Sequence, residues 1–256
     1  MHSNLIAGLI AASCIWTAPL AATQLKTAAQ DNAPKFIKSG TEITGIAVDV
    51  MRAIERVDPE LKFVGDQQFV PMKRIEAGLS SEATSDGHLD VFIGIGKDPE
   101  REKLFVFSKR PLYTVKNVLA VRTTDDVQIG SLEDIKKLPG NNVILANSGY
   151  TQAKQLHAIP GLNIDDAARL NENNIEKLAY GRARFYLCAD VGLYHTLKTH
   201  PDKDKIKVLS GSYGEAINWI GFSRALSKVT ADKVEAAFQK VVDTGEFDKI
   251  MKKYSK

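Results

Sequence analysis

The chain has 256 residues, of which 44% are hydrophobic and 25% are charged, and its formal net charge is +3. A chain of this length and apolar content can bury a substantial core, as one large domain or two modest lobes, which excludes a disordered or fibrous protein. The small net charge is spread along the chain and forms no basic stripe, so nucleic acid is not an expected partner.

An apolar run opens the sequence. It extends from Leu5 to Trp16, small residues follow from Ala18 to Ala22, and no Asp, Glu, Lys or Arg occurs before Lys26. Because the run is too short to cross about 30 Å of hydrocarbon, it predicts a secretion signal over residues 1–22, cleaved near Ala22. We therefore expect the mature protein in the periplasm. The alternative is a buried N-terminal helix.

The sequence contains two cysteines, Cys14 and Cys188. Cleavage of the signal would remove Cys14, so the mature protein is expected to carry one thiol and no internal disulfide. The small residues before Cys14 faintly resemble a lipoprotein attachment box, and a lipid anchor at Cys14 is the less favoured alternative. Cys188 lies in an apolar segment and is interpreted as a buried thiol, not a nucleophile.

Short apolar segments alternate with helical patterns after the signal. Strands are expected over Leu61 to Val64, Leu89 to Ile93 and Val143 to Ala146. This alternation predicts an α/β fold with mainly parallel sheets. No internal repeat or flexible linker divides the chain, so two lobes would have to be joined by strands.

Four segments have well-defined patterns. A helix is expected from Ile46, with its apolar residues on one face. Residues 80–87 are polar and are predicted to form an exposed loop. A second helix follows Ser131, in a capping box with Asp134. Near the C-terminus, an apolar stripe predicts a helix that ends at Gly245, and an amphipathic helical turn follows it.

Common catalytic signatures are absent from the sequence. It has no Walker loop, no G-x-G-x-x-G, no H-E-x-x-H and no G-x-S-x-G. The five histidines are scattered and lack the paired spacing of metal ligands. Neither a cofactor nor a metal site is expected.

Several segments, in a fixed order, resemble those of a known family. They are residues 44–50 (TGIAVDV), 89–94 (LDVFIG), 98–101 (DPER), 107–108 (FS), 131–134 (SLED), 148–151 (SGYT), 181–182 (GR) and 243–250 (DTGEFDKI). Their order and spacing are similar to those of the family 3 extracellular solute-binding proteins, the polar amino-acid receptors of ABC importers. The resemblance covers nearly all of the mature chain.

The resemblance implies a type II periplasmic-binding fold, in which two α/β lobes are joined by two strand crossovers and close on a ligand in the cleft between them. Lobe 1 would comprise residues 23–114 and 218–256, and lobe 2 residues 115–217. The implied function is that of a non-catalytic monomer, which captures an amino acid or a related small carboxylate and delivers it to a membrane ABC permease.

The resemblance also indicates ligand-binding residues on lobe 1. Arg101 matches the arginine that grips the ligand carboxylate, since a guanidinium fork fits both carboxylate oxygens. The alternative is a surface arginine paired with Glu100 or Glu102. Gly96 falls where the family aims backbone or hydroxyl groups at the same ligand.

The other indicated residues precede expected helices. Tyr150 and Thr151, on lobe 2, would complete the carboxylate site through free backbone amides and the Thr151 hydroxyl, unless they only cap the helix. Phe69 and Met72 lie where the family presents an aromatic platform, and the alternative is ordinary core packing.

The chain departs from the family pattern at three places. Ala33, within residues 32–36 (NAPKF), stands near an expected tyrosine, so one wall of the site is thinner or differently built. Ala189 stands where amino-acid receptors place an aspartate for the ammonium, and Asp190 is one residue further on. If the alignment with the family is shifted by one residue, Asp190 pairs with the ammonium of the ligand. If Ala189 is placed correctly, the ammonium would be unpaired, and a carboxylate ligand without an amine is favoured. Arg184 replaces an acidic residue.

Two other functions stay open. An enzyme on the same scaffold, similar to the periplasmic cyclohexadienyl dehydratases, would require a carboxylic acid kept protonated by burial in the cleft, and Asp190 and Glu215 are the candidates. A soluble sensor would use the same closure to present a new surface to a partner.

Overall fold

The structure, a computed structural model, describes residues 22–254. The predicted secretion signal, apart from its last residue, and Cys14 lie outside the described residues. Within the described part, no helix is both long enough and apolar enough to span a bilayer.

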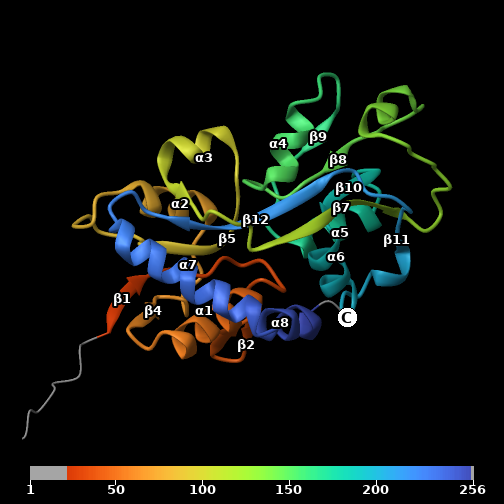
Figure 1. Cartoon of the computed structure of the whole chain (residues 1–256). Helices are drawn as coiled ribbons and strands as arrows, with labels where there is room; N and C mark the ends of the chain where they lie inside the picture. The colour runs from red at the N-terminus through yellow and green to blue at the C-terminus, as the bar shows by residue number, and fades with distance from the viewer. Residues whose placement is uncertain (1–21, 255–256) are drawn as a thin grey trace, which may run out of the picture.

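Strands and helices alternate along the described chain (Figure 1). The elements as far as the first long strand are β1 (Thr23–Lys26), β2 (Ile37–Ser39), β3 (Glu42–Thr44), α1 (Ile46–Val57), β4 (Leu61–Val64), α2 (Met72–Ser80), β5 (Val91–Gly96), α3 (Pro99–Leu104), β6 (Val106–Phe107) and β7 (Tyr113–Arg122). The remaining elements are η1 (Leu132–Lys137), β8 (Ile144–Leu145), α4 (Thr151–His157), β9 (Ile164–Asp165), α5 (Asn171–Ala179), β10 (Phe185–Ala189), α6 (Asp190–Leu197), η2 (Lys203–Lys205), β11 (Ile206–Val208), β12 (Glu215–Phe222), α7 (Lys228–Asp243) and α8 (Glu246–Tyr254). This order confirms the predicted α/β class.

Local sequence patterns account for several of these elements. Helix α1 begins at Ile46 as its apolar periodicity predicts, and Ile46, Val50 and Ile54 are buried. Strand β4 has the predicted limits, whereas β5 begins later than predicted and runs on to Gly96. The predicted loop is exposed from residue 82 to residue 87.

The helix predicted after Ser131 is the short 3-10 helix η1. Its capping box is present, with the Asp134 carboxylate accepting from the Ser131 amide at 3.0 Å. At the other end of the chain, Gly245 separates α7 from α8 with a φ of 71°, a left-handed conformation that favours glycine. Helix α8 is tied to α1, because Lys253 and Tyr254 both donate to the Asp49 carboxylate at 2.8 Å.

The largest sheet runs through the middle of the molecule, with strand order β5-β12-β7-β10-β8-β9. Figure 1 shows β7 and β12 between a first half that holds α1, α2, α3 and α7 and a second half that holds α4, α5 and α6. Strand β7 carries the chain from the first half to the second, and β12 carries it back. The two strands pair over residues 113–116 and 215–218.

The prediction of mainly parallel sheets is wrong. Among the strands of residues 22–254, three pairs are parallel, β1 with β4, β10 with β8 and β8 with β9, and the other six are antiparallel. Because β7 leaves the first half and β12 returns to it, their shared ladder is antiparallel. Five of the six antiparallel pairs contain β7 or β12, so the crossing strands account for the difference.

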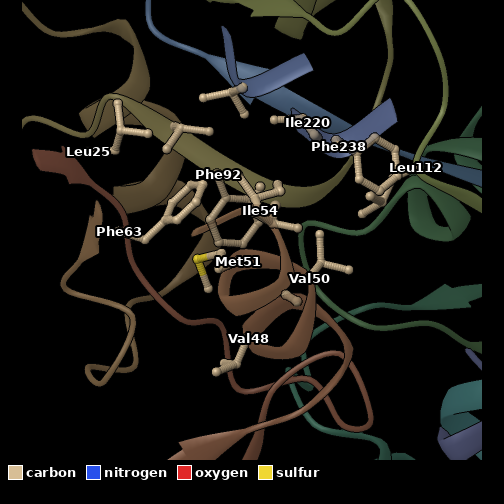
Figure 2. Close-up of a cluster of buried hydrophobic side chains, with 14 of the residues drawn as sticks. Leu25, Val48, Val50, Met51, Ile54, Phe63, Phe92, Leu112, Ile220 and Phe238 are labelled. Atoms are coloured by element: carbon tan, nitrogen blue, oxygen red, sulfur yellow. The ribbon is translucent and has the colours of Figure 1, made fainter. Parts of the chain in front are cut away.

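Each half of the molecule has its own apolar core. In the first half, Met51 and Ile54 of α1 pack with Phe63 of β4 and Phe92 of β5 in one buried cluster, which also includes Phe238 of α7 (Figure 2).

The second half buries both faces of its sheet. Alternate residues of β7 belong to two different clusters, Leu119 to one and Val118 to the other, since successive side chains of a strand point to opposite faces. Cys188 of β10 belongs to the second cluster and is a buried free thiol, as predicted.

Candidate functional site

A cavity lies between the two halves of the molecule, beside the paired strands β7 and β12. Its volume is about 90 Å³, which is room for a small molecule or several waters. The lining residues of the first half are Gln30, Asn32, Ala33, Pro34, Lys35, Ile46, Met72, Gly94, Gly96 and Arg101. Those of the second half are Asn147, Gly149, Tyr150, Thr151, Gln152, Asn171, Leu187, Cys188, Ala189, Val191 and Gly192, and the crossing strands add Tyr113, Val115, Ala216, Ile217 and Asn218.

The charged side chains that line this cavity are all basic. Lys35 and Arg101 are its cations, and no Asp or Glu side chain lines the cavity in the part of the chain that the structure describes. The other polar groups are neutral carboxamides and hydroxyls. No group of three or more His, Cys, Asp and Glu side chains that could hold a metal occurs among residues 22–254. The arrangement therefore suits recognition of a small polar molecule by hydrogen bonds and positive charge.

Arg101 is buried at the wall of the cavity, with its side chain 3% exposed. Its Nε donates to Oε1 of Glu76, on α2, at 2.8 Å, and its Nη2 lies 2.7 Å from the same oxygen. Nη1 donates to the Gly96 carbonyl oxygen at 2.9 Å and Nη2 donates to the Gly149 carbonyl oxygen at 3.0 Å. The guanidinium therefore links three segments, one of which belongs to the second half.

The alternative pairing of Arg101 with Glu100 or Glu102 is not found. Glu100 accepts from Lys154 at 3.1 Å, and Glu102 lies 2.8 Å from the ammonium of Lys97. The second carboxylate near Arg101 is that of Asp98, at 3.6 Å from Nε.

Gly96 and Thr151 meet across the cavity. A Cβ atom at Gly96 would lie 2.5 Å from Cγ2 of Thr151, which is shorter than any normal carbon–carbon contact. Lys154, on α4, also crosses between the halves and donates to Asp98 at 2.9 Å. The two halves are therefore closed on each other, and only glycine fits at position 96.

Tyr150 and Thr151 lie at the start of α4, as predicted. Helix α4 begins at Thr151, and neither side chain caps it. Both residues line the cavity, as does Met72 at the start of α2. Phe69 lines an adjoining cavity instead, which shares Met72 and Tyr150 with the first. Phe69 and Met72 also pack against the core of the first half. Met72 therefore combines a place in the cavity wall with core packing, whereas Phe69 does not line this cavity.

Asp190 does not line the cavity. It opens α6, and its Oδ1 accepts from the amide of Val191 at 2.7 Å. Its neighbour Ala189 lines the cavity, at the position where the resemblance placed an ammonium partner. Arg184 lies away from the cavity and pairs with Asp125 at 2.7 Å.

The sequence reasoning missed Lys35, which is 6% exposed. Its Nζ donates to the Gly94 carbonyl oxygen at 2.6 Å and to Oε1 of Gln30 at 2.9 Å. Burial, and secondarily the nearby charge of Arg101, lower the pKa of Lys35 to about 7. The available signal was a lysine between Pro34 and Phe36, in the segment where the chain departs from the family pattern.

The tyrosines of the cavity were only partly anticipated. Tyr150 was among the predicted residues, whereas Tyr113 of β7 was not. Burial raises the pKa of both phenols above the ordinary value, so both hydroxyls are neutral and can donate.

The carboxamides of the second half were also missed, because nothing in the local sequence marks them. Asn147 donates to Oδ1 of Asn171 at 2.8 Å and accepts from Asn174 and from the Tyr186 hydroxyl at 2.7 Å each. This network orients the amide groups at the cavity wall before any molecule binds.

Comparisons with known proteins agree with this architecture. A model of the bacterial extracellular solute-binding proteins, family 3, matches residues 25–256. The L-cystine-binding protein TcyJ of Bacillus subtilis (strain 168) is 24% identical over 227 residues, which are 86% of this chain and 78% of that protein.

Two solved structures share the fold. The probable amino-acid ABC transporter extracellular-binding protein ytmK of Bacillus subtilis aligns with a TM-score of 0.74 at 17% identity, over 91% of this chain and 97% of that one. The ancestral amino acid-binding protein AncCDT-1, a precursor of cyclohexadienyl dehydratase, aligns with a TM-score of 0.72 at 20% identity, over 91% and 96% of the two chains. These likenesses confirm the expected two-lobed type II fold, and the match over nearly the whole chain shows that this protein belongs to the family 3 extracellular solute-binding proteins.

Proposed function

We propose that this protein captures an amino acid or a related small carboxylate in the periplasm and delivers it to a membrane ABC permease. The observation that carries the proposal is the polar cavity between the two halves, which is lined from both. A molecule held there contacts both halves and so favours their closed arrangement. The ligands named for the relatives, L-cystine and amino acids, support this class of small polar solute.

The proposed lobes are residues 23–114 with 218–256, and residues 115–217. The separate apolar cores support this division. The hinge would lie in the paired segments of β7 and β12, because the chain crosses between the halves only there within the described residues. The protein would act as a monomer, since each lobe buries its own core.

The proposed location depends on the secretion signal over residues 1–22. Sequencing the N-terminus of the protein recovered from the cell envelope tests it, and a start near Thr23 is expected. Recovery of an intact Met1 would contradict the signal. A lipid-modified Cys14 at the N-terminus would instead establish the anchored form.

An enzyme on this scaffold is the less supported function. The carboxylic acid that elimination chemistry needs would have to lie in the cavity, but Asp190 and Glu215 do not line it. Glu215 is exposed at the start of β12. The likeness to AncCDT-1 does not favour catalysis, since that protein is itself described as amino acid-binding.

A thermal-shift screen of amino acids and small carboxylates tests the proposed function. A molecule that binds only the folded protein, at 100 times its dissociation constant, stabilises the protein by about 2.7 kcal/mol. At least one member of the two classes is expected to raise the melting temperature, with isothermal titration calorimetry giving the affinity. If no member of either class binds, the proposed function is wrong.

A further inference from the structure

The ammonium of Lys35 is a buried cation without a carboxylate partner among residues 22–254. Its two acceptors, the Gln30 side-chain oxygen and the Gly94 carbonyl oxygen, are neutral dipoles at 2.9 and 2.6 Å. They solvate the charge but do not neutralise it. An ammonium has three N–H donors, so one donor has no protein acceptor in the described structure.

The surroundings of Lys35 supply no negative charge either. The rings of Phe36 and Phe92 lie 6.0 and 5.4 Å from Nζ, where their faces attract a cation weakly. The charged group that acts on it from α3 is another cation, Arg101. Tyr113 approaches Gly94 from β7, and its phenol is neutral because burial raises its pKa.

Arg101 differs from Lys35 in its charge balance. The Arg101 guanidinium pairs with Glu76 at 2.7 Å and lies 3.6 Å from Asp98. When Lys35 is protonated, its positive charge is therefore the one left unbalanced at the cavity. The lining also offers no carboxylate to a ligand ammonium, which would meet two cations instead.

A buried charge is costly unless it is paired, and here the cavity is the place where a counter-charge can enter. We propose that the cavity binds a small carboxylate that lacks an amino group, and that Lys35 holds its carboxylate. This inference rests on the proposed function and narrows its ligand class. It also explains why Asp190 can lie outside the cavity, since the ligand brings no ammonium to pair.

The test compares acids in matched pairs on the wild-type mature protein by calorimetry. Pyruvate and lactate are matched with L-alanine, succinate and malate with L-aspartate, and 2-oxoglutarate with L-glutamate. At least one amine-free acid is expected to bind, and at least about 30-fold more tightly than its amino counterpart, because an unpaired ammonium would be desolvated beside cations.

The outcomes separate the two proposals. Tighter binding of an amino acid than of its amine-free counterpart would overturn this inference and leave the proposed function standing. If no acid of the panel binds but the thermal-shift screen finds another amino acid, this inference falls and the proposed function stands; both fall only if the screen also finds no ligand.

The role of Lys35 is tested with Lys35→Met, which keeps the length of the side chain and removes the charge. The affinity for the bound acid is expected to fall at least about 30-fold, with no loss of melting temperature because an unpaired buried charge is removed. Lys38→Met, at an exposed lysine of β2, is the matched control and should bind normally. Unchanged affinity in Lys35→Met would overturn the assignment.

Proton uptake offers a second readout that needs no variant. A bound carboxylate raises the pKa of Lys35 from its value of about 7 in the free protein. The affinity for the carboxylate is therefore highest below pH 7. It falls by up to tenfold per pH unit as the pH rises from 7 towards the pKa of Lys35 in the complex. Calorimetry at pH 8 in two buffers of different ionisation enthalpy should show uptake of nearly one proton per ligand. Binding without proton uptake would contradict the role of Lys35.

Discussion

Arg101 contributes to both stability and binding, because its guanidinium joins Glu76, the Gly96 carbonyl and the Gly149 carbonyl. Arg101→Lys keeps the charge, but one ammonium cannot reach all three acceptors. We expect the free energy of unfolding to fall by about 2 kcal/mol, since hydrogen bonds to charged groups contribute about 1.5–3 kcal/mol each. Chemical denaturation measures this change, and calorimetry with the screened ligand should show weaker binding.

The matched control for Arg101→Lys is Arg110→Lys. Arg110 donates to Gln239 at an exposed site, away from the cavity. Its replacement should change neither the unfolding free energy nor the affinity. If Arg101→Lys also leaves the unfolding free energy and the ligand affinity unchanged, Arg101 has no role in the closed structure.

Gly96 is expected to tolerate no larger residue. In Gly96→Ala the new methyl group would lie 2.5 Å from Cγ2 of Thr151, so the two halves cannot close fully. We expect the affinity for the screened ligand to fall at least tenfold while the melting temperature of the ligand-free protein changes little. Gly130→Ala is the control, because the φ of Gly130 is outside the left-handed region, a Cβ atom there would lie at an ordinary 3.4 Å from Oδ2 of Asp134, and Gly130 does not line the cavity. Normal affinity in Gly96→Ala would show that closure does not require the close contact.

Helices α3 and α4 are linked across the cavity by Lys154, which pairs with both Asp98 and Glu100. Asp98 caps α3 by accepting from the amides of Glu100 and Arg101 at 3.0 Å each, and it also accepts from Lys154 of α4 at 2.9 Å. Burial opposes the ionised form of Asp98, but the hydrogen bonds from Lys154 and Arg101 outweigh burial and lower its pKa. The same carboxylate thus stabilises a helix end and the contact between the halves.

Lys154→Ala is expected to weaken this contact slightly. Exposed ion pairs contribute about 0.2–1 kcal/mol, so the affinity for the screened ligand should fall less than about sixfold. The affinity should depend more on salt in the wild type than in the variant, since salt screens exposed charges. A loss of affinity that is independent of salt would contradict an electrostatic contact. Lys137→Ala, at an exposed lysine of η1 that also pairs with an aspartate, is the control.

The ionisation of Asp98 makes the closed form sensitive to acid. The pKa of Asp98 is lowered in the closed structure. Ionised Asp98 therefore stabilises the closed form fully above the ordinary aspartate pKa of about 3.9, and this stabilisation is lost as the pH falls through the lowered pKa. Scattering of the ligand-bound protein between pH 6 and pH 3 should show opening only at the acid end. A profile that changes near neutral pH would point to a different group.

At the scale of the whole molecule, the two halves are expected to open and close about the paired segments of β7 and β12. A ligand that contacts both halves favours the closed form, so its addition should lower the radius of gyration in small-angle scattering. Gly96→Ala should stay more open than the wild type at saturating ligand. An identical profile with and without a tightly bound ligand would contradict hinge closure in solution.

Elements with a strong local signal were predictable from the sequence. The apolar periodicity of α1, the capping box of Ser131 and Asp134 and the glycine after α7 each depend on residues only a few positions apart. The order of short motifs along the chain indicated the family, and the family match confirms it. Those motifs also led to Arg101, Gly96, Tyr150 and Thr151, which the structure brings together around one cavity.

Only the tertiary structure decided the pairing of strands and the charges at the cavity. Whether a strand pairs parallel or antiparallel depends on where the chain crosses between the two halves, and that is a long-range property. In the sequence, nothing distinguishes Lys35 from an ordinary surface lysine. In the folded protein, Phe36, Phe92 and Gly94 lie around its ammonium. Asp190, one residue beyond a cavity-lining alanine, points its carboxylate at its own helix. The sequence alone determined the class of protein, because local patterns and motif order suffice for that, whereas the electrostatics of the site depend on segments distant in sequence that fold around it.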